Sequence, residues 1–512
     1  MFKTNRILCI LTLLLSLLNQ LTAQTKHHEL SIEVAVDNSL KESFQTQGRL
    51  FVFLSEHPNL EPMKQIWPNP YSRTHIFARN IDHVKEGASL QLNHKDAWIK
   101  TTDWNLNEIP EGTYYVQLLW DQDTKESRTD APGNLHTQKQ EIILDSDQHV
   151  KFILNQKIEP RTITEHELSK LIVLKSDTLS KWWNKPMHLK ASVLLPHNYD
   201  INKAYPIRYN VAGYGGRYTR INRLISNKTF MDWWDSDDAP QIISVFLDGE
   251  GPFGDSYQMD SDNSGPYGYS LIHELIPFIE KSYRGTNSMT TRFVDGCSTG
   301  GWVSLGLQLY YPDVFNGVYS YSPDAIDFEN YQLINIYNES NAYINEFGYL
   351  RPIMRDVNGE PLLSLKDFIA YENVFGQSNT YLNSGGQFSA HTALYSPKGI
   401  NGLPKPMFDP KTGEIDSLVA KAWGKYDFKK YVKTNWAELG PKLQGKIYIW
   451  MGDMDEFYLN TGTRGFDEFI KTTSDPKSDA VIEFTPMEGH CWQFSHKKVL
   501  LKIQDRIHGM QD

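Results

Sequence analysis

The sequence predicts two domains, an α/β domain with a mostly parallel sheet and a β-sandwich that precedes it. The chain has 512 residues, which is long enough to form more than one hydrophobic core. Short alternating apolar stretches separated by turn-rich segments occupy residues 25–158, as expected of a β-sandwich. In residues 159–512, apolar strands alternate with amphipathic helices. That alternation is typical of a parallel sheet with helices on both faces.

The first 24 residues are predicted to be a signal peptide. Lys3 and Arg6 precede an apolar run from Ile7 to Leu18, and small residues around Ala23 follow it. A run of about a dozen apolar residues is too short to span a bilayer as a helix. We therefore expect a secreted or periplasmic protein, with an N-terminal membrane anchor as the alternative.

Individual strands can be assigned from the apolar runs in each domain. The β-sandwich strands are expected at 30–36, 48–54, 113–120, 140–144 and 150–154. Those of the α/β sheet are expected at 207–211, 242–247, 293–294, 318–321, 447–450 and 481–484. Apolar residues at helical spacing predict one helix from Tyr269 to Tyr283, with a local irregularity at Pro277.

The strand and helix alternation stops between residues 324 and 443, where the chain is rich in Tyr, Asn, Gly and Pro. Long irregular regions inside a compact domain are usually functional or are misread elements. We expect an insertion that forms a lid or a wall of the substrate pocket, in preference to a plain surface excursion. His391 is the candidate pocket residue within it.

A G-x-S-x-G pentapeptide, Gly296 to Gly300, follows a short apolar strand and begins a helix. This strand-turn-helix setting is that of the nucleophile elbow of α/β-hydrolases, in which glycines leave room for a strained turn that exposes the serine hydroxyl. Ser298 is therefore the predicted nucleophile. An ordinary glycine-rich turn is the alternative interpretation.

A serine nucleophile needs a base and an acid, which in this fold follow it in chain order. His490 lies in the loop after the last predicted strand, so it is the candidate base. Asp453 and Asp455 both follow the strand before it, where such sheets collect catalytic groups. We favour Asp455 as the acid, because it completes a G-x-x-D pattern, and Asp453 as a turn cap.

The oxyanion hole is predicted to combine two backbone N–H groups, one from Thr299 and one from Tyr214 in the loop AGYGG. Gly213, Gly215 and Gly216 would permit the close approach of the backbone to the substrate. A simple tight turn is the alternative for this loop.

These motifs resemble those of tannases and feruloyl esterases, which share a Cys-Ser, Asp and His-Cys arrangement. The elbow GCSTGG, the G-x-x-D ending at Asp455 and the pair His490-Cys491 carry the resemblance. The span from Leu171 onward is similar to the esterase D-like group of α/β-hydrolases. The resemblance implies that Ser298, His490 and Asp455 form the triad and that Cys297 pairs with Cys491 in a disulfide. Two buried thiols beside the site are the alternative.

The composition limits the class of partner. A formal net charge of −11 argues against nucleic acid and against an anionic membrane surface. We expect no cofactor and no metal, and the sequence predicts no oligomeric state. Aromatic residues crowd the predicted active-site loops and would suit a flat acyl group or a sugar ring, although core packing explains any single one equally well.

Together these patterns predict a secreted serine carboxylic ester hydrolase that acts through an acyl-enzyme. Its expected substrate is a small-molecule or polysaccharide-linked ester, with acyl or feruloyl groups as the part removed. A serine peptidase of the same fold and a non-catalytic glycan-binding protein are the alternatives.

Overall fold

The computed structural model describes residues 26–85, 87–123 and 126–509. The predicted signal peptide therefore lies outside the described residues. Within the described ranges, no helix combines the length and the apolar character that a membrane crossing requires.

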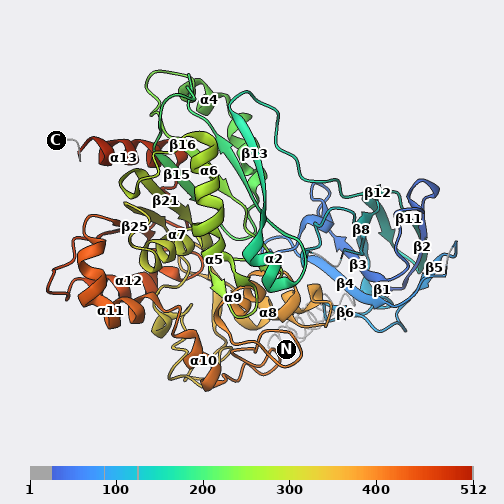
Figure 1. Cartoon of the computed structure of the whole chain (residues 1–512). Coiled ribbons are helices and arrows are strands. Elements are labelled where there is room, and N and C mark those ends of the chain that lie inside the picture. Colours follow the sequence, from blue (N-terminus) through green and yellow to red (C-terminus); the bar gives the residue numbers. More distant parts are fainter. Residues whose placement is uncertain (1–25, 86, 124–125, 510–512) are drawn as a thin grey trace, which may run out of the picture. The chain divides into compact units, whose positions relative to one another are not determined.

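The chain divides into two compact units (Figure 1). The first contains Met1–Gln122 and Asn134–Lys157, and the second contains Asp123–Gly133 and Ile158–Asp512. The expected division lies after residue 158, so the structure differs chiefly in assigning Asp123–Gly133 to the second unit. The physical reason is that charged side chains of this segment pair with residues of the second unit, as described below.

The first unit is built from strands around one hydrophobic core. One sheet has the order β12-β9-β8-β3-β4-β6 with β10 added to β8, and a three-stranded sheet has the order β11-β2-β5. Leu50, Val52 and Leu54 of β3 contribute to the core shared with β2 and β11. The strands are β1 (His27–His28), β2 (Leu30–Val36), β3 (Gly48–Ser55), β4 (Thr74–Ile81), β5 (Leu90–Leu92), β6 (Ile99–Lys100), β7 (Ile109–Pro110), β8 (Gly112–Asp121), β9 (Leu135–His136), β10 (Gln140–Leu144), β11 (Gln148–Leu154) and β12 (Gln156–Lys157).

The second unit is built on an eight-stranded sheet with the order β13-β14-β16-β15-β21-β22-β25-β26. From β16 to β26 every neighbouring pair is parallel, whereas β13 and β14 are antiparallel at one edge. The strands are β13 (Ser169–Ser176), β14 (Met187–Leu194), β15 (Ile207–Val211), β16 (Ile243–Leu247), β21 (Arg292–Cys297), β22 (Val318–Tyr321), β25 (Ile447–Gly452) and β26 (Val481–Thr485). Every residue of β15, β16 and β22 is buried, as expected of a sheet covered on both faces.

Helices connect the parallel strands (Figure 1). They include α3 (Ile221–Ile225), α4 (Lys228–Trp234), α7 (Thr299–Tyr310) and α12 (Leu459–Ile470). In contrast, α2 (Asp177–Trp183) joins the antiparallel strands β13 and β14, and α13 (His496–His508) follows the last strand, β26. The helix expected from Tyr269 to Tyr283 is interrupted. It consists of α5 (Tyr267–Ser270), a π-helical turn (Leu271–Leu275) and α6 (Ile276–Tyr283). Pro277 has no N–H to donate to the preceding turn, which is consistent with a wider turn just before it.

Residues 324–443 contain more regular structure than the sequence suggested. They form the hairpin β23 (Pro352–Arg355) and β24 (Pro361–Ser364), then α8 (Leu365–Phe375), α9 (Gln387–Tyr395), α10 (Ser417–Trp423) and α11 (Phe428–Leu443). The expectation of an irregular region was therefore wrong. All eight residues from Phe388 to Tyr395 of α9 are buried, so this helix lacks the amphipathic period by which helices are predicted. Further short hairpins pair β17 (Glu250–Gly251) with β18 (Gly254–Asp255) and β19 (Asp260–Ser261) with β20 (Gly265–Pro266).

Candidate active site

Ser298 occupies the sharp turn between β21 and α7. Its backbone has φ 61° and ψ −129°, a conformation that is strained for a residue with a side chain. The turn depends on the flanking glycines. A Cβ at Gly296 would lie 2.4 Å from backbone atoms of Gly300, and a Cβ at Gly300 would lie 2.3 Å from the carbonyl oxygen of Val211. Larger residues at either position would therefore collide with the backbone.

The side chains of Asp455 and His490 are in direct contact. The Nδ1 atom of His490 lies 2.6 Å from Oδ2 of Asp455. Asp455 is fully buried, and its Oδ1 accepts hydrogen bonds from the N–H groups of Phe457 at 3.0 Å and Leu459 at 3.3 Å. These backbone bonds hold the carboxylate, so Oδ2 keeps one direction toward the imidazole.

The pKa of His490 is raised above its ordinary value. Burial by itself disfavours the imidazolium. The charge and hydrogen bond of Asp455, together with the charges of Asp324 and Glu456, outweigh burial. The imidazole therefore binds a proton more tightly than an isolated histidine does.

The loop that carries His490 is held by two side chains that the sequence analysis did not single out. A carboxylate oxygen of Glu456 accepts a hydrogen bond from the His490 N–H. Ser322, which follows β22, accepts one from the Cys491 N–H at 3.0 Å. The only sequence signal for them is position, since Glu456 follows Asp455 directly and Ser322 follows the end of a strand.

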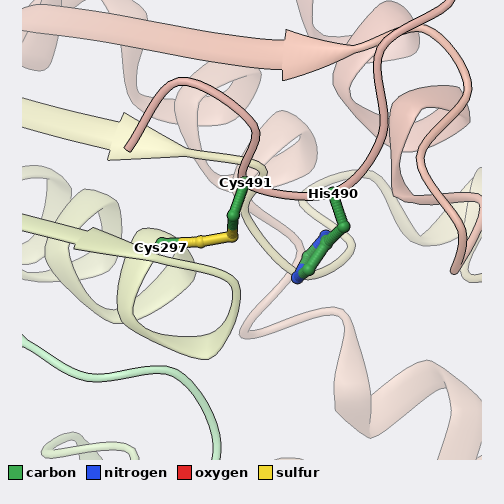
Figure 2. Close-up of side chains that lie close together, drawn as sticks. All are labelled: Cys297, His490 and Cys491. Atoms are coloured by element: carbon green, nitrogen blue, oxygen red, sulfur yellow. A yellow bond between two sulfur atoms is a disulfide. The ribbon is translucent and has the colours of Figure 1, made fainter. Parts of the chain in front are cut away.

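Cys297 and Cys491 form a disulfide that lies beside the His490 ring (Figure 2). Their α-carbons are 6.0 Å apart, within the ordinary range for a disulfide, and 194 positions separate them in the sequence. The bond joins the residue before Ser298 to the residue after His490, so it fixes the backbone of one relative to the other. The two sulfurs and the His490 ring lie within 4.8 Å of one another, but sulfurs bonded to each other are not the thiolates that a metal requires.

Asp453, the alternative acid, has a different environment from Asp455. Its carboxylate pairs with the guanidinium of Arg464. Its carbonyl oxygen accepts hydrogen bonds from Arg355 at 3.2 Å and from the side-chain amide of Asn460 at 2.9 Å. Asp453 thus takes part in an ion pair next to the turn, while Asp455 contacts His490.

The glycine-rich loop Gly213–Gly216 lies next to Ser298. A Cβ at Gly213 would be 3.6 Å from the Cβ of Ser298, and the Gly216 N–H closes the turn by donating to the Gly213 carbonyl at 3.0 Å. The hydroxyl of Tyr214 donates to the carbonyl of Gly385. Asp255 accepts the Gly215 N–H at 3.0 Å, and burial raises the pKa of Asp255 to about 7 despite that hydrogen bond.

A second aspartate and histidine lie behind the elbow. Oδ2 of Asp324 accepts hydrogen bonds from the hydroxyls of Thr299 and Tyr257, both at 2.9 Å. His391 lies 3.4 Å from the same oxygen through Nε2, and its Nδ1 lies 2.7 Å from the Tyr331 hydroxyl. Burial alone would raise the pKa of Asp324, but these bonds and the charge of His391 lower it. Asp324 follows the end of β22, a signal that the sequence analysis overlooked.

Three tryptophans near the predicted active-site loops serve as packing residues. Trp233 and Trp234 belong to a buried cluster with residues of α13, and Trp302, which belongs to the elbow helix α7, is fully buried. Trp492, two residues after His490, is 42% exposed. Of these four tryptophans, Trp492 is the most exposed.

Comparison with known proteins identifies the family. A family model described as Putative esterase matches residues 184–497, which is more than half of the chain. No curated protein sequence matches the chain.

Solved structures with a similar fold share little sequence identity with this chain. A ferulic acid esterase is 15% identical, with 66% of this chain and 98% of that protein covered and a TM-score of 0.41. The fluorophosphonate-binding serine hydrolase F of Staphylococcus aureus is 12% identical over 66% and 98% of the two chains, with a TM-score of 0.38. An S-formylglutathione hydrolase from Agrobacterium tumefaciens is 14% identical over 68% and 96%, with a TM-score of 0.38. On the family match, the chain belongs to the Putative esterase family of α/β-hydrolases and is a carboxylic ester hydrolase.

Proposed function

We propose that Ser298, His490 and Asp455 form a catalytic triad that hydrolyses esters through an acyl-enzyme. The observation that carries this proposal is the 2.6 Å contact between His490 and Asp455. In the same structure a disulfide joins the neighbours of Ser298 and His490. A carboxylate bound to Nδ1 holds the imidazole in one tautomer, with Nε2 as the proton acceptor.

In this mechanism His490 takes the proton of the Ser298 hydroxyl as its oxygen bonds to the ester carbonyl carbon. The tetrahedral intermediate then expels the alcohol, which receives the proton from His490, and the acyl group stays on Ser298. Water attacks the acyl-enzyme in the same way and releases the acid. Asp455 stabilises the imidazolium that forms in both halves of the reaction.

The backbone N–H groups of Thr299 and Tyr214 would stabilise the oxyanion. Thr299 is the first residue of α7, so its N–H lies at the positive end of a helix dipole. The loop containing Tyr214 runs beside Ser298, as the Gly213 distance indicates. Both features support an oxyanion hole at this edge of the sheet.

The proposed substrate is an acyl or feruloyl ester of a polysaccharide outside the cytoplasm. The signal-like N-terminus and the disulfide support an oxidising compartment. The exposed ring of Trp492, two residues after His490 in the sequence, offers a flat apolar surface. In this proposal the first unit is a β-sandwich that helps to position the glycan, and residues 324–443 form a lid or pocket wall.

The test combines a fluorophosphonate probe with matched variants of the unreduced protein. Mass spectrometry should find the label on Ser298 in the wild type and none in Ser298→Ala. A panel of aryl esters and peptide amides then compares the two activities. Folded wild-type protein without label on Ser298 would contradict the triad, and faster cleavage of amides than of esters would favour a peptidase.

A further inference from the structure

The segment Asp123–Gly133 lies in the sequence between β8 and β9 of the first unit but belongs to the catalytic unit. At its end, the Gly133 N–H donates to the carbonyl of Ile158 at 2.8 Å. Residues 126–133 are described throughout, so their contacts can be followed one by one. They show that a piece of chain from the N-terminal part of the sequence packs near the loop Gly213–Gly216.

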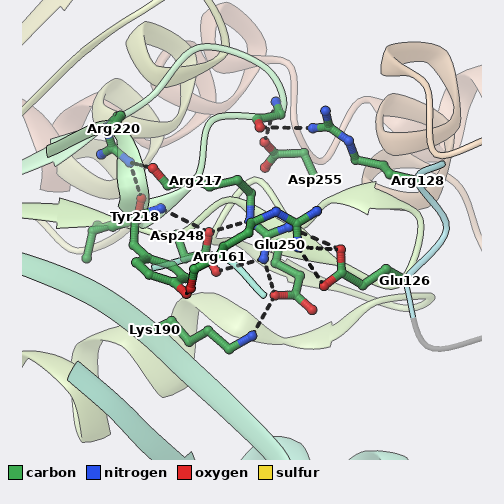
Figure 3. Close-up of polar contacts among 12 residues, drawn as sticks. Glu126, Arg128, Arg161, Lys190, Arg217, Tyr218, Arg220, Asp248, Glu250 and Asp255 are labelled. Atoms are coloured by element: carbon green, nitrogen blue, oxygen red, sulfur yellow. Dashed lines mark hydrogen bonds and ion pairs between the residues drawn. The ribbon is translucent and has the colours of Figure 1, made fainter. Parts of the chain in front are cut away.

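A network of charged side chains anchors this segment (Figure 3). The Glu126 carboxylate accepts a hydrogen bond from Arg161 at 3.0 Å and one from Arg217 at 3.2 Å. Arg217 also donates to Asp248 at 2.8 Å. The side chains of Glu126, Arg161 and Arg217 are all less than 15% exposed. A buried ionic network whose members pair with one another favours one arrangement of the chain over others.

From this anchored segment, Arg128 reaches the glycine-rich loop. Its Nη1 donates to the Gly215 carbonyl at 2.9 Å, and its guanidinium lies 5.9 Å from the centroid of the Tyr214 ring. A Cβ at Gly215 would lie only 2.0 Å from this nitrogen. The absence of a side chain at residue 215 is therefore what allows the guanidinium to approach the backbone.

Gly215 is held from both ends. Asp255 accepts its N–H at 3.0 Å, while Arg128 donates to its carbonyl. The residue has φ +69°, in the left-handed region that glycine enters easily and also leaves easily. The two side chains thus restrict a flexible residue, and with it the direction of the neighbouring peptide groups.

We propose that Arg128 is a positioning residue that holds the loop Gly213–Gly216 in the conformation needed for oxyanion stabilisation. The segment between β8 and β9 would then complete the catalytic site of a unit that lies elsewhere in the sequence. This inference rests on the proposed function, because it requires the Tyr214 N–H to face the oxyanion.

The role predicts a specific kinetic signature. Oxyanion donors bind the tetrahedral state better than the ester, so a displaced donor slows the chemical step and leaves substrate binding unchanged. Loss of one donor, or a displacement of about 1 Å, slows catalysis by about a hundredfold or more in other enzymes. Because Arg128 acts through the loop, we expect a fall in kcat of about tenfold to a hundredfold.

The experiment compares Arg128→Ala, Arg128→Lys and wild type as full-length protein. The measured quantities are kcat and KM for an aryl ester and the affinity for an alkyl boronic acid, which forms a tetrahedral adduct with the serine. In Arg128→Ala we expect kcat and boronate affinity to fall together, with KM within about twofold. Arg128→Lys should lie in between, and added guanidinium ion should restore part of the kcat of Arg128→Ala.

Three further variants separate the ways in which the proposal could fail. Arg79, an arginine of the first unit paired with Asp96, provides the matched control, and Arg79→Ala should keep the wild-type kcat. If Ser298→Ala remains active, the proposed function itself is wrong. If Ser298→Ala is inactive but folded Arg128→Ala keeps the wild-type kcat, or changes only KM, the role of Arg128 is wrong. Should Arg128→Ala not fold, Arg128→Gln replaces it, since its shorter side chain cannot reach Gly215, and a wild-type kcat there overturns the inference.

Discussion

Two aspartate-histidine pairs lie close to the nucleophile elbow, and they differ in geometry. In the Asp455–His490 pair, Nδ1 lies 2.6 Å from the carboxylate and the histidine side chain is 16% exposed. In the Asp324–His391 pair, Nε2 lies 3.4 Å from the carboxylate and the histidine is 2% exposed. The first pair has the shorter contact and a partly exposed histidine, whereas the second has a longer contact and a buried histidine.

The two histidines also differ in how many of their ring nitrogens have a partner. Both ring nitrogens of His391 are occupied, one by Asp324 and the other by the Tyr331 hydroxyl. The Asp455 contact uses only Nδ1 of His490. An aspartate beside a histidine is therefore not enough to indicate catalysis. The imidazole also needs a second nitrogen that can face the substrate, and the enclosed pair is better suited to bracing Thr299 behind the elbow.

The largest contrast is expected from replacing each aspartate by asparagine. Asp455→Asn should lower kcat by about 10⁴-fold, because an amide next to Nδ1 favours the wrong tautomer. Asp324→Asn should lower kcat by less than about tenfold, since Asp324 bonds the elbow at Thr299 and influences His490 only through its charge. Steady-state kinetics on an aryl ester checks both, and Asp453→Asn serves as the control for Asp455. Equal losses of kcat in Asp455→Asn and Asp324→Asn would contradict the conclusion that the two pairs have different roles.

Removal of the disulfide should disturb the Asp455–His490 pair much more than the buried Asp324–His391 pair. The double variant Cys297→Ala/Cys491→Ala frees the backbone around Ser298 and His490 and should reduce the free energy of unfolding by about 2 to 5 kcal/mol. We expect kcat to fall as well, because the nucleophile and base lose their covalent connection. Urea unfolding and ester kinetics measure the two effects. A variant as stable and active as the wild type would show that the loop contacts of Ser322 and Glu456 are sufficient.

His391→Phe should act on stability more than on rate. The change leaves Asp324 and the Tyr331 hydroxyl each without one buried partner, which should cost about 2 to 4 kcal/mol in the free energy of unfolding. The kcat of the folded protein should remain within about tenfold of wild type. A loss of activity as large as in His490→Ala, without a loss of stability, would instead make His391 part of the chemistry.

The smallest effect is a shift in the pH dependence. His490 must be neutral to accept the serine proton, so activity falls as pH drops through its pKa, which lies above its usual value. Because the charge of Asp324 helps to raise this pKa, Asp324→Asn should move the acid limb of kcat/KM toward lower pH. A profile of kcat/KM from pH 5 to 9 measures the shift. Movement toward higher pH would show that Asp324 does not stabilise the imidazolium.

The central strands β15, β16 and β22 could be predicted because they are buried on both faces and read as short apolar runs. The same reasoning failed for residues 324–443. There α9 is buried all round, so its sequence carries no helical period although its backbone is regular. It also failed for Asp123–Gly133, whose placement depends on ion pairs between residues far apart in the chain. Local patterns contain no information about such pairs.

By itself, the sequence determined the order of the chemical groups along the chain. Ser298 follows one strand, Asp455 and Asp453 follow another, and His490 follows the last, because parallel strands bring their carboxyl ends to one edge of the sheet. Only the tertiary structure decided which aspartate contacts His490, which histidine is enclosed with Asp324, and which arginine reaches Gly215. Those choices depend on distances of a few ångströms between residues that are many positions apart. Such distances are set by the packing of the whole unit and not by neighbouring residues.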